Sequence, residues 1–191
     1  SEVERVRAQY DLPPRFLLSV GTIEPRKNLT RLVESLAQLR KEDRGLQLIV
    51  VGAKGWLYDD FFQRAEALNQ TDAVRLLGYV PDDDLPAIFG AATVYVMASV
   101  YEGAGLPVLE AMACGTPVVS SRESSMPELG ADVPRYVNPY DVNHMTEVIG
   151  TVLNDDRLRA AMAAVGPERA ARFSWERAAR ETLAVYRGVM H

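Results

Sequence analysis

Cysteine, histidine and long apolar runs are scarce in this chain of 191 residues. The single cysteine, Cys114, excludes an intrachain disulfide and favours a reducing compartment, so we expect the cytoplasm. The two histidines, His144 in a late helical pattern and His191 at the end, offer no evident general base. No apolar run approaches the roughly 20 residues that span a bilayer, so we expect no transmembrane segment and at most peripheral binding at the inner membrane face. A net charge of −5 argues against a nucleic-acid partner.

The chain has enough apolar residues for one domain. Hydrophobic residues make up 48% of the sequence, which suits a single well-packed core over residues 1–191. Because Ser1 is not a methionine and no signal peptide follows it, we expect the chain to be part of a longer protein.

Short apolar runs alternate with longer helical patterns. The apolar runs predict strands at 16–20, 46–51, 74–77, 93–97, 117–120 and 135–137. The periodic segments predict helices at 29–41, 57–69, 82–90, 106–113, 142–153, 157–165 and 175–189. This alternation predicts an α/β fold, a Rossmann-like parallel sheet of about six strands with helices on both faces. Ligands of such sheets bind beyond the carboxyl ends of the strands, where Gly21, Gly52 and Gly78 fall.

Two cations follow the first strand. Arg26 and Lys27 lie just after Pro25, and adjacent cations at a strand end suit a diphosphate, with arginine as a fork and lysine as a point charge. The alternative is an ordinary approach to the next helix, capped by Asn28 or Thr30.

A second pattern places carboxylates on both sides of a glycine-rich turn. Glu102 precedes Gly103, Ala104 and Gly105, and Glu110 lies one turn into the helix that follows. A turn of this kind lets the backbone approach an anion and directs N–H groups at it. Carboxylates beside an anion site make sense when they accept hydrogen bonds from hydroxyls of the same ligand. A nucleotide sugar has both parts, whereas the alternative is two solvated surface acids.

The chain resembles the C-terminal, donor-binding domain of a retaining glycosyltransferase of the GT-B fold, family 4 or group 1. The resemblance covers about residues 15–189 and rests on residues 21–28, the loop at 76–80 and the motif at 102–119. It implies that the chain binds a GDP-, UDP- or ADP-hexose, needs no cofactor or metal, and transfers the sugar together with an N-terminal acceptor domain. It also implies that the terminal helix, at 175–190, packs on that missing domain.

The resemblance assigns a role to each matching position. Arg26 and Lys27 hold the diphosphate and stabilise the departing charge, while the N–H groups around Gly105 and Leu106 bind the distal phosphate. Glu102 contacts donor-sugar hydroxyls, Glu110 the ribose, and the backbone at Val80 the base. The leaving phosphate oxygen takes the acceptor's proton, so no protein base is required. The family often has phenylalanine at the position of Ala104, a departure that leaves the phosphate turn intact and bears on the shape of the sugar pocket.

Three alternatives remain open. Residues 82–84 are all aspartate and could bind a divalent metal, although an aspartate-capped helix start is the favoured interpretation, so no metal is expected. An epimerase would share the phosphate site but needs acid and base residues that are not evident. A non-catalytic module would bind the nucleotide sugar alone. Among the aromatic residues, Trp56, Phe61, Phe62 and Trp175 are expected to pack helices in the core.

Overall fold

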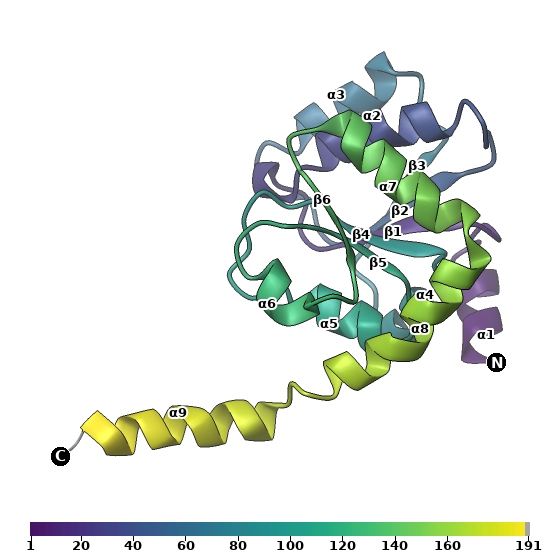
Figure 1. Cartoon of the computed structure of the whole chain (residues 1–191). Helices are drawn as coiled ribbons and strands as arrows, with labels where there is room; N and C mark the ends of the chain where they lie inside the picture. The colour runs from purple at the N-terminus through teal and green to yellow at the C-terminus, as the bar shows by residue number, and fades with distance from the viewer. Residues whose placement is uncertain (190–191) are drawn as a thin grey trace.

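The fold is built on one parallel sheet. The computed structural model describes residues 1–189, so Met190, in the expected span of the terminal helix, lies outside the described residues, as does His191. The six strands are β1 (Phe16–Val20), β2 (Gln47–Val51), β3 (Val74–Gly78), β4 (Val94–Met97), β5 (Val118–Ser121) and β6 (Arg135–Val137). They lie in the order β3-β2-β1-β4-β5-β6, and every neighbouring pair is parallel. This arrangement confirms the predicted Rossmann-like fold (Figure 1).

The strand order reverses direction beside β1. The chain adds β2 and β3 on one side of β1, then returns to pair β4 with its other side. The loops that follow β1 and β4 therefore diverge from neighbouring strand ends, and this is the point at which such sheets bind ligands.

The described part of the chain contains nine α-helices and one 3₁₀ turn, of which the 3₁₀ turn and α2 to α6 connect the strands. The helices are α1 (Glu2–Gln9), α2 (Leu29–Leu39), α3 (Asp59–Ala67), α4 (Leu85–Ala91), α5 (Leu106–Ala113), α6 (Met126–Gly130), α7 (Val142–Asn154), α8 (Asp156–Ala170) and α9 (Trp175–Val189). The 3₁₀ turn, η1, spans Pro25–Lys27.

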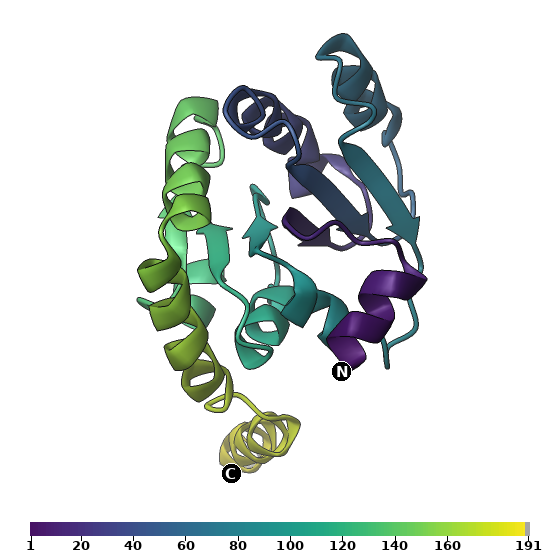
Figure 2. The ribbon, with the colours of Figure 1, turned by 90° about the vertical axis from the view of Figure 1, so that its right-hand side faces the viewer.

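Helices cover both faces of the sheet (Figure 2). One apolar cluster joins one face to α2, α3 and α7, and the other joins the opposite face to α1, α4, α5 and α6. In α2 the residues Leu29, Leu32, Val33 and Leu36 are all buried, as their spacing predicts. Each such side chain contributes about 1.5–3 kcal/mol when it is fully buried.

Two helices were not predicted from the sequence, and one was predicted to begin too early. Both α1 and α6 are absent from the expected elements, and α4 begins at Leu85 rather than at 82. The expected aspartate cap is wrong for Asp84, because its buried side chain makes no cap hydrogen bond. Instead it accepts hydrogen bonds from Arg5, Gln9 and Tyr10 around the end of α1. Asp84 therefore fastens α1 to α4.

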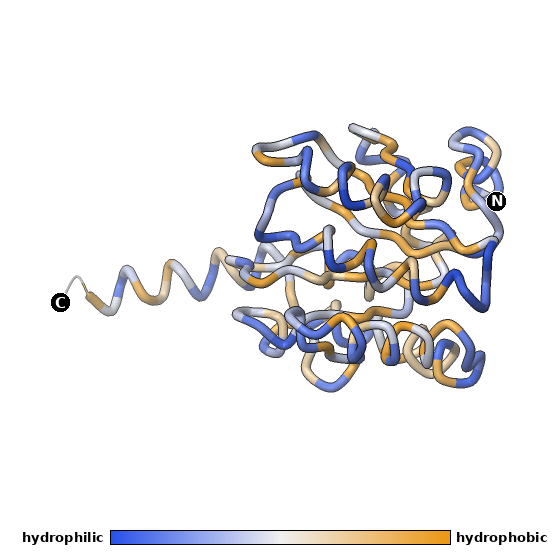
Figure 3. The backbone as a smooth tube through the Cα atoms, turned by 90° about the horizontal axis from the view of Figure 1, so that it is seen from above, coloured by the Kyte–Doolittle hydropathy of each residue, from blue (hydrophilic) through white to orange (hydrophobic). Residues whose placement is uncertain are grey.

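Two tryptophans do not pack as expected. Trp56 is 59% exposed and Trp175 is 77% exposed, whereas Phe61 is buried as predicted and Phe62 is partly buried. Trp175 begins α9, a helix that projects from the body and buries no residue (Figure 1, Figure 3). None of the helices within residues 1–189 has the length and apolar composition needed to cross a membrane.

We expect the attachment of α1 to depend on pH through Asp84. The hydroxyl of Tyr10 and the guanidinium of Arg5 hold the pKa of the Asp84 carboxyl below its ordinary value. A carboxyl with a lowered folded-state pKa stabilises the fold above its unfolded pKa, about 4, and loses that contribution as pH falls. Asp84→Asn should therefore flatten the decline of the unfolding free energy below about pH 5, measured by urea titration. An equal decline in both proteins would contradict this role.

Candidate functional site

An ion cluster joins the loops that follow β1 and β4. Arg26 and Lys27 lie in η1, and Glu102 lies four residues before α5. Oε2 of Glu102 is 2.6 Å from Nη1 of Arg26, and its Oε1 is 2.7 Å from Nζ of Lys27. Glu24 adds a second carboxylate, which pairs with Nε of Arg26. The sequence therefore brings two cations and two carboxylates together at the switch point of the sheet.

The loop that carries the cations is fixed by Asn28. This residue has a left-handed backbone (φ 58°) and makes no side-chain cap, so the expected cap by Asn28 is wrong. Its buried Nδ2 donates instead to the carbonyls of Ala98 and Pro139, at 3.0 and 2.7 Å. Val100 also donates its N–H to the carbonyl of Arg26 at 2.8 Å. These hydrogen bonds set where Arg26 and Lys27 lie relative to β4.

Two glycines allow close backbone packing beneath the cluster. Gly21 and Gly52 end β1 and β2 with φ of 136° and 144°. A Cβ on Gly52 would lie 2.1 Å from the carbonyl oxygen of Gly21, and one on Gly21 would lie 2.9 Å from Nζ of Lys27. A side chain at either position would displace the backbone or the lysine.

The start of α5 presents backbone N–H groups beside the cluster. Gly105 has φ 65° at the N-cap, and a Cβ there would lie 2.2 Å from Cε of Met126. Within residues 1–189, the N–H groups of Gly105 and Leu106 donate to no other group of the chain, as expected at a helix start. Gly103 and Ala104 are exposed, and a Cβ on Gly103 would meet nothing within 4 Å. Of the turn's two glycines, only Gly105 is required by the backbone.

Glu102 is held as an anion. Burial by itself would raise the pKa of this carboxyl, but hydrogen bonds from Lys27, Ser99 and Arg26 outweigh it and leave the pKa lowered. Oγ of Ser99 donates to Oε1 at 2.8 Å. A carboxylate offers about four lone pairs, so these three donors leave about one for a ligand.

The predicted ribose and base contacts, Glu110 and Val80, lie outside the ion cluster. Glu110 is exposed on α5 and forms no ion pair among the described residues. Partial desolvation, followed by the charge of Asp82, raises the pKa of the Glu110 carboxyl. Val80 is 4% exposed in the loop that follows β3. The structure thus joins Arg26 and Lys27 to Glu102 by ion pairs, with Gly21 close to Lys27, while no ion pair or hydrogen bond among the described residues joins Glu110 or Val80 to them.

The aspartates at 82–84 do not assemble a metal site. In the part of the chain that the structure describes, no three His, Cys, Asp or Glu side chains form a group that could hold a metal ion. Asp84 is engaged with α1, as described above.

The model of the family described as "Glycosyl transferases group 1" matches residues 2–169 of this chain. The chain belongs to this family. Its fold is that of a domain of GT-B glycosyltransferases, as the resemblance implied.

Similar proteins include enzymes of sugar transfer. The chain is 41% identical over 173 residues to O-antigen chain mannosyltransferase B of Escherichia coli, a match that covers 90% of this chain and 45% of the relative. It is 35% identical to the MMP alpha-(1->4)-mannosyltransferase of Mycolicibacterium hassiacum, with 90% and 42% covered. The solved sucrose-phosphate synthase of Thermosynechococcus elongatus superposes with a TM-score of 0.83 at 30% identity, covering 98% and 49%. The chain spans less than half the length of the curated relatives it matches.

Sequence reasoning missed four residues that support the group 1 site. Glu24 pairs with Arg26, Ser99 donates to Glu102, and Ser124 and Ser125 bond to the backbone of Glu102. Glu24 lies within the recognised segment at 21–28 and Ser99 lies near the motif at 102–119, and an acid two residues before two cations was the signal that could have identified Glu24. The serines at 124 and 125 come from a loop over twenty residues away, and no local pattern connects them to the site.

We expect Glu102 to stabilise the domain because it neutralises a buried lysine. The side chain of Lys27 is 10% exposed, and removing the partner of a buried charge costs on the order of 3 kcal/mol. Glu102→Ala should lower the unfolding free energy by about that amount in urea denaturation. The matched control Glu110→Ala should stay within about 0.5 kcal/mol of wild type. Equal losses in the two variants would count against the role given to Glu102.

Proposed function

We propose that this chain is the donor-binding domain of a glycosyltransferase. It binds a nucleotide-diphospho-hexose and, with a second domain that binds the acceptor, transfers the hexosyl group with retention. The mannosyltransferase names of two relatives favour mannose as the sugar, with glucose as the next candidate.

Unused donors on the two cations carry this proposal. Arg26 uses Nε for Glu24 and Nη1 for Glu102 and the carbonyl of Tyr101, and within residues 1–189 its Nη2 donates to nothing. Nζ of Lys27 bonds to Glu102 alone among the described residues, which leaves two of its three protons. Together with the N–H groups of Gly105 and Leu106, these donors suit the oxygens of a diphosphate.

The acids suit the sugar parts of the same ligand. The remaining lone pair of Glu102 would accept a hydroxyl of the transferred sugar, next to the phosphate that leaves. Glu110, on the exposed side of α5, would accept the ribose hydroxyls, and the backbone at Val80 would meet the base. The separation of Glu102 from Glu110 supports contacts at two different places on one extended ligand.

The reaction breaks the bond between the anomeric carbon and the phosphate oxygen and forms a bond from that carbon to the acceptor oxygen on the same face. Negative charge grows on the departing diphosphate, where Arg26, Lys27 and the amides of α5 would stabilise it. The departing phosphate oxygen takes the acceptor's proton, so the chain need not supply a base.

We propose that these cations act without a metal or other cofactor. Each cation has donors that no group of the described chain uses, and among the described residues those at 82–84 do not form a ligand group. The single Cys114 suits a reducing compartment, and we propose the cytoplasm, with peripheral docking at the inner membrane face decided by the other half.

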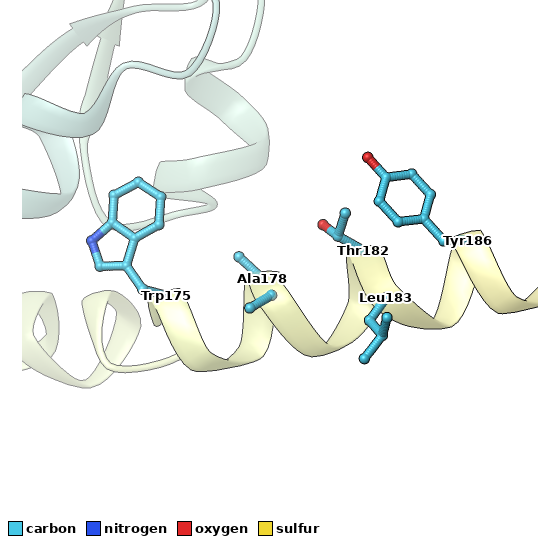
Figure 4. A pocket seen from close by; sticks show the side chains of 6 residues that line it. Trp175, Ala178, Thr182, Leu183 and Tyr186 are labelled. Carbon is cyan, nitrogen blue, oxygen red and sulfur yellow. The ribbon is translucent and has the colours of Figure 1, made fainter.

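The second domain is also part of the proposal. The matched relatives are more than twice as long as their matching segment, so this chain would supply one wall of the cleft and the second domain the other. Trp175, Thr182 and Tyr186 project from one side of α9 and line a shallow pocket with Ala178 (Figure 4). An exposed apolar stripe on a projecting helix supports packing of α9 on that domain.

A thermal-shift panel tests the donor site. GDP, UDP and ADP, with their mannose and glucose forms, should include one nucleotide that raises the melting temperature of the chain, because a ligand at 100 times its Kd adds about 2.7 kcal/mol. Arg26→Ala should abolish the shift, and Arg44→Ala, an exposed arginine before β2, should retain it. The responding nucleotide identifies the donor, while silence across the panel at millimolar concentration rejects the proposal.

Turnover separates the alternatives. In the whole protein, Arg26→Ala should reduce hexosyl transfer by two orders of magnitude or more, on the scale of removing one electrostatic donor, about 10²–10³-fold. Epimerised donor without acceptor would indicate an epimerase, and donor binding without any reaction would indicate a binding module. The isolated chain should bind donor and transfer nothing, since it supplies one wall of the cleft.

The position of α9 can be tested with one tryptophan. Trp175→Ser should leave the stability of the isolated chain unchanged, because its side chain is 77% exposed there. The same substitution should cost the whole protein about 3 kcal/mol, as for a buried aromatic residue. Arg180→Gln, on the opposite side of α9, should be neutral in both contexts. Equal stability of wild type and Trp175→Ser in the whole protein would exclude the proposed packing.

A further inference from the structure

The loop that follows β5 is bonded to the turn that carries Glu102. The N–H of Glu102 donates to Oγ of Ser124 at 2.9 Å, and Oγ of Ser125 donates to the carbonyl of Glu102 at 3.3 Å. Met126 packs against the same turn, since its Cε fills the space that a Cβ on Gly105 would need. Both backbone groups of Glu102 are therefore satisfied by consecutive serines from another loop.

Ser124 adopts a conformation that serine disfavours. Its φ is +49°, in the left-handed region where a Cβ is crowded and glycine is preferred. The residue is exposed, so its side chain adds no core packing. The bond to Glu102 is the one hydrogen bond that its hydroxyl makes among the described residues. A strained residue whose hydroxyl makes this single contact indicates that the contact itself matters.

Ser125 is also used in an unusual way. It occupies the N-cap of α6, where serine normally accepts an N–H of the first turn, yet it makes no such cap. Its hydroxyl turns toward the carbonyl of Glu102. The start of α6 therefore lacks a side-chain cap, because the hydroxyl of Ser125 donates to the turn before α5 instead.

We infer that Ser124 and Ser125 are positioning residues for Glu102. They fix the backbone on both sides of its Cα, so that its carboxylate reaches Arg26, Lys27 and Ser99 and keeps its last lone pair turned toward the transferred sugar. This inference rests on the proposed function. It predicts that the two serines govern transfer of the sugar and leave binding of the nucleotide part unchanged, because the diphosphate meets Arg26, Lys27 and the α5 amides.

The experiment uses the whole protein and compares four serine variants. Ser124→Gly removes the hydroxyl and relieves the backbone, so its melting temperature should be equal to or above that of wild type while kcat falls about tenfold or more, as expected for a misplaced active-site group. Ser124→Ala should lose the same kcat and also melt below wild type, because the hydrogen bond to Glu102 is lost while the strain of the positive φ remains. Ser125→Ala should lower kcat, and Ser125→Thr, which keeps the hydroxyl, should restore it.

Two readouts exclude a general structural effect. The affinity for the free nucleoside diphosphate that gives the thermal shift should be unchanged in all four serine variants, so that any loss appears in kcat. In a Glu102→Gln background, Ser124→Gly should cause no further loss of kcat, because both changes act through one carboxylate. Asn69→Gly, at another exposed residue with positive φ (+54°), is the matched control and should leave kcat at the wild-type value.

Two results would overturn the inference. One is a wild-type kcat in Ser124→Gly and Ser125→Ala while the wild-type protein transfers sugar. The other is an equal fold-loss from Ser124→Gly with and without Glu102→Gln, which would show that the serine acts elsewhere. If the wild-type protein neither binds a nucleotide sugar nor transfers one, the proposed function fails and the inference falls with it, so the two failures are distinguishable.

Discussion

The carboxylate of Glu102, shared between Arg26 and Lys27, is the interaction on which the rim of this domain depends. Lys27 is nearly buried, and a buried ammonium is stable only with a counter-charge close by. The same glutamate is bonded through its backbone to the loop that follows β5. One residue thus connects the loops that follow β1, β4 and β5, which are neighbouring strands in the sheet, with β1 more than 70 residues before β4 in the sequence.

Backbone conformations that most residues avoid are concentrated at the same rim. Gly21, Gly52 and Gly105 have positive φ there, and so do Asn28 and Ser124. At Gly52 the reason is contact, because the carbonyl of Gly21 occupies the place of a Cβ. At Asn28 and Ser124 the reason is the side chain, which bonds across to a neighbouring loop. The sheet supplies a stable core below, and this stability offsets the strain of holding the loops in one arrangement.

The elements that could be predicted were those marked by a pattern within their own short stretch of sequence. The apolar runs of the strands and the stripe of α2 report burial directly, and the motif at 102–110 marks a turn before a helix. The helix α6 has five residues and includes Pro127 and Gly130, so it shows no helical repeat of apolar residues. The helix α1 buries only Val6 and therefore has no apolar stripe to predict it from. Asp84 was misassigned because a helix cap and a tertiary acceptor use the same residue type. Trp56 was wrongly predicted to be buried, because the hydrophobicity of a side chain indicates a preference for burial but does not show whether a packing partner lies near it.

The balance of charge at the site limits how an anion can be recognised. Two cations face two carboxylates, Glu24 and Glu102, so the cluster has no net positive field to attract phosphate in general. Attraction must come from particular N–H groups: Nη2 of Arg26, the free protons of Lys27 and the amides at the start of α5. Such donors bind a ligand tightly when its oxygens match their directions, and they bind a bare anion weakly. On the proposed function, a diphosphate joined to a sugar fits this demand better than inorganic phosphate, because its hydroxyl meets the remaining lone pair of Glu102 while its phosphates meet the donors.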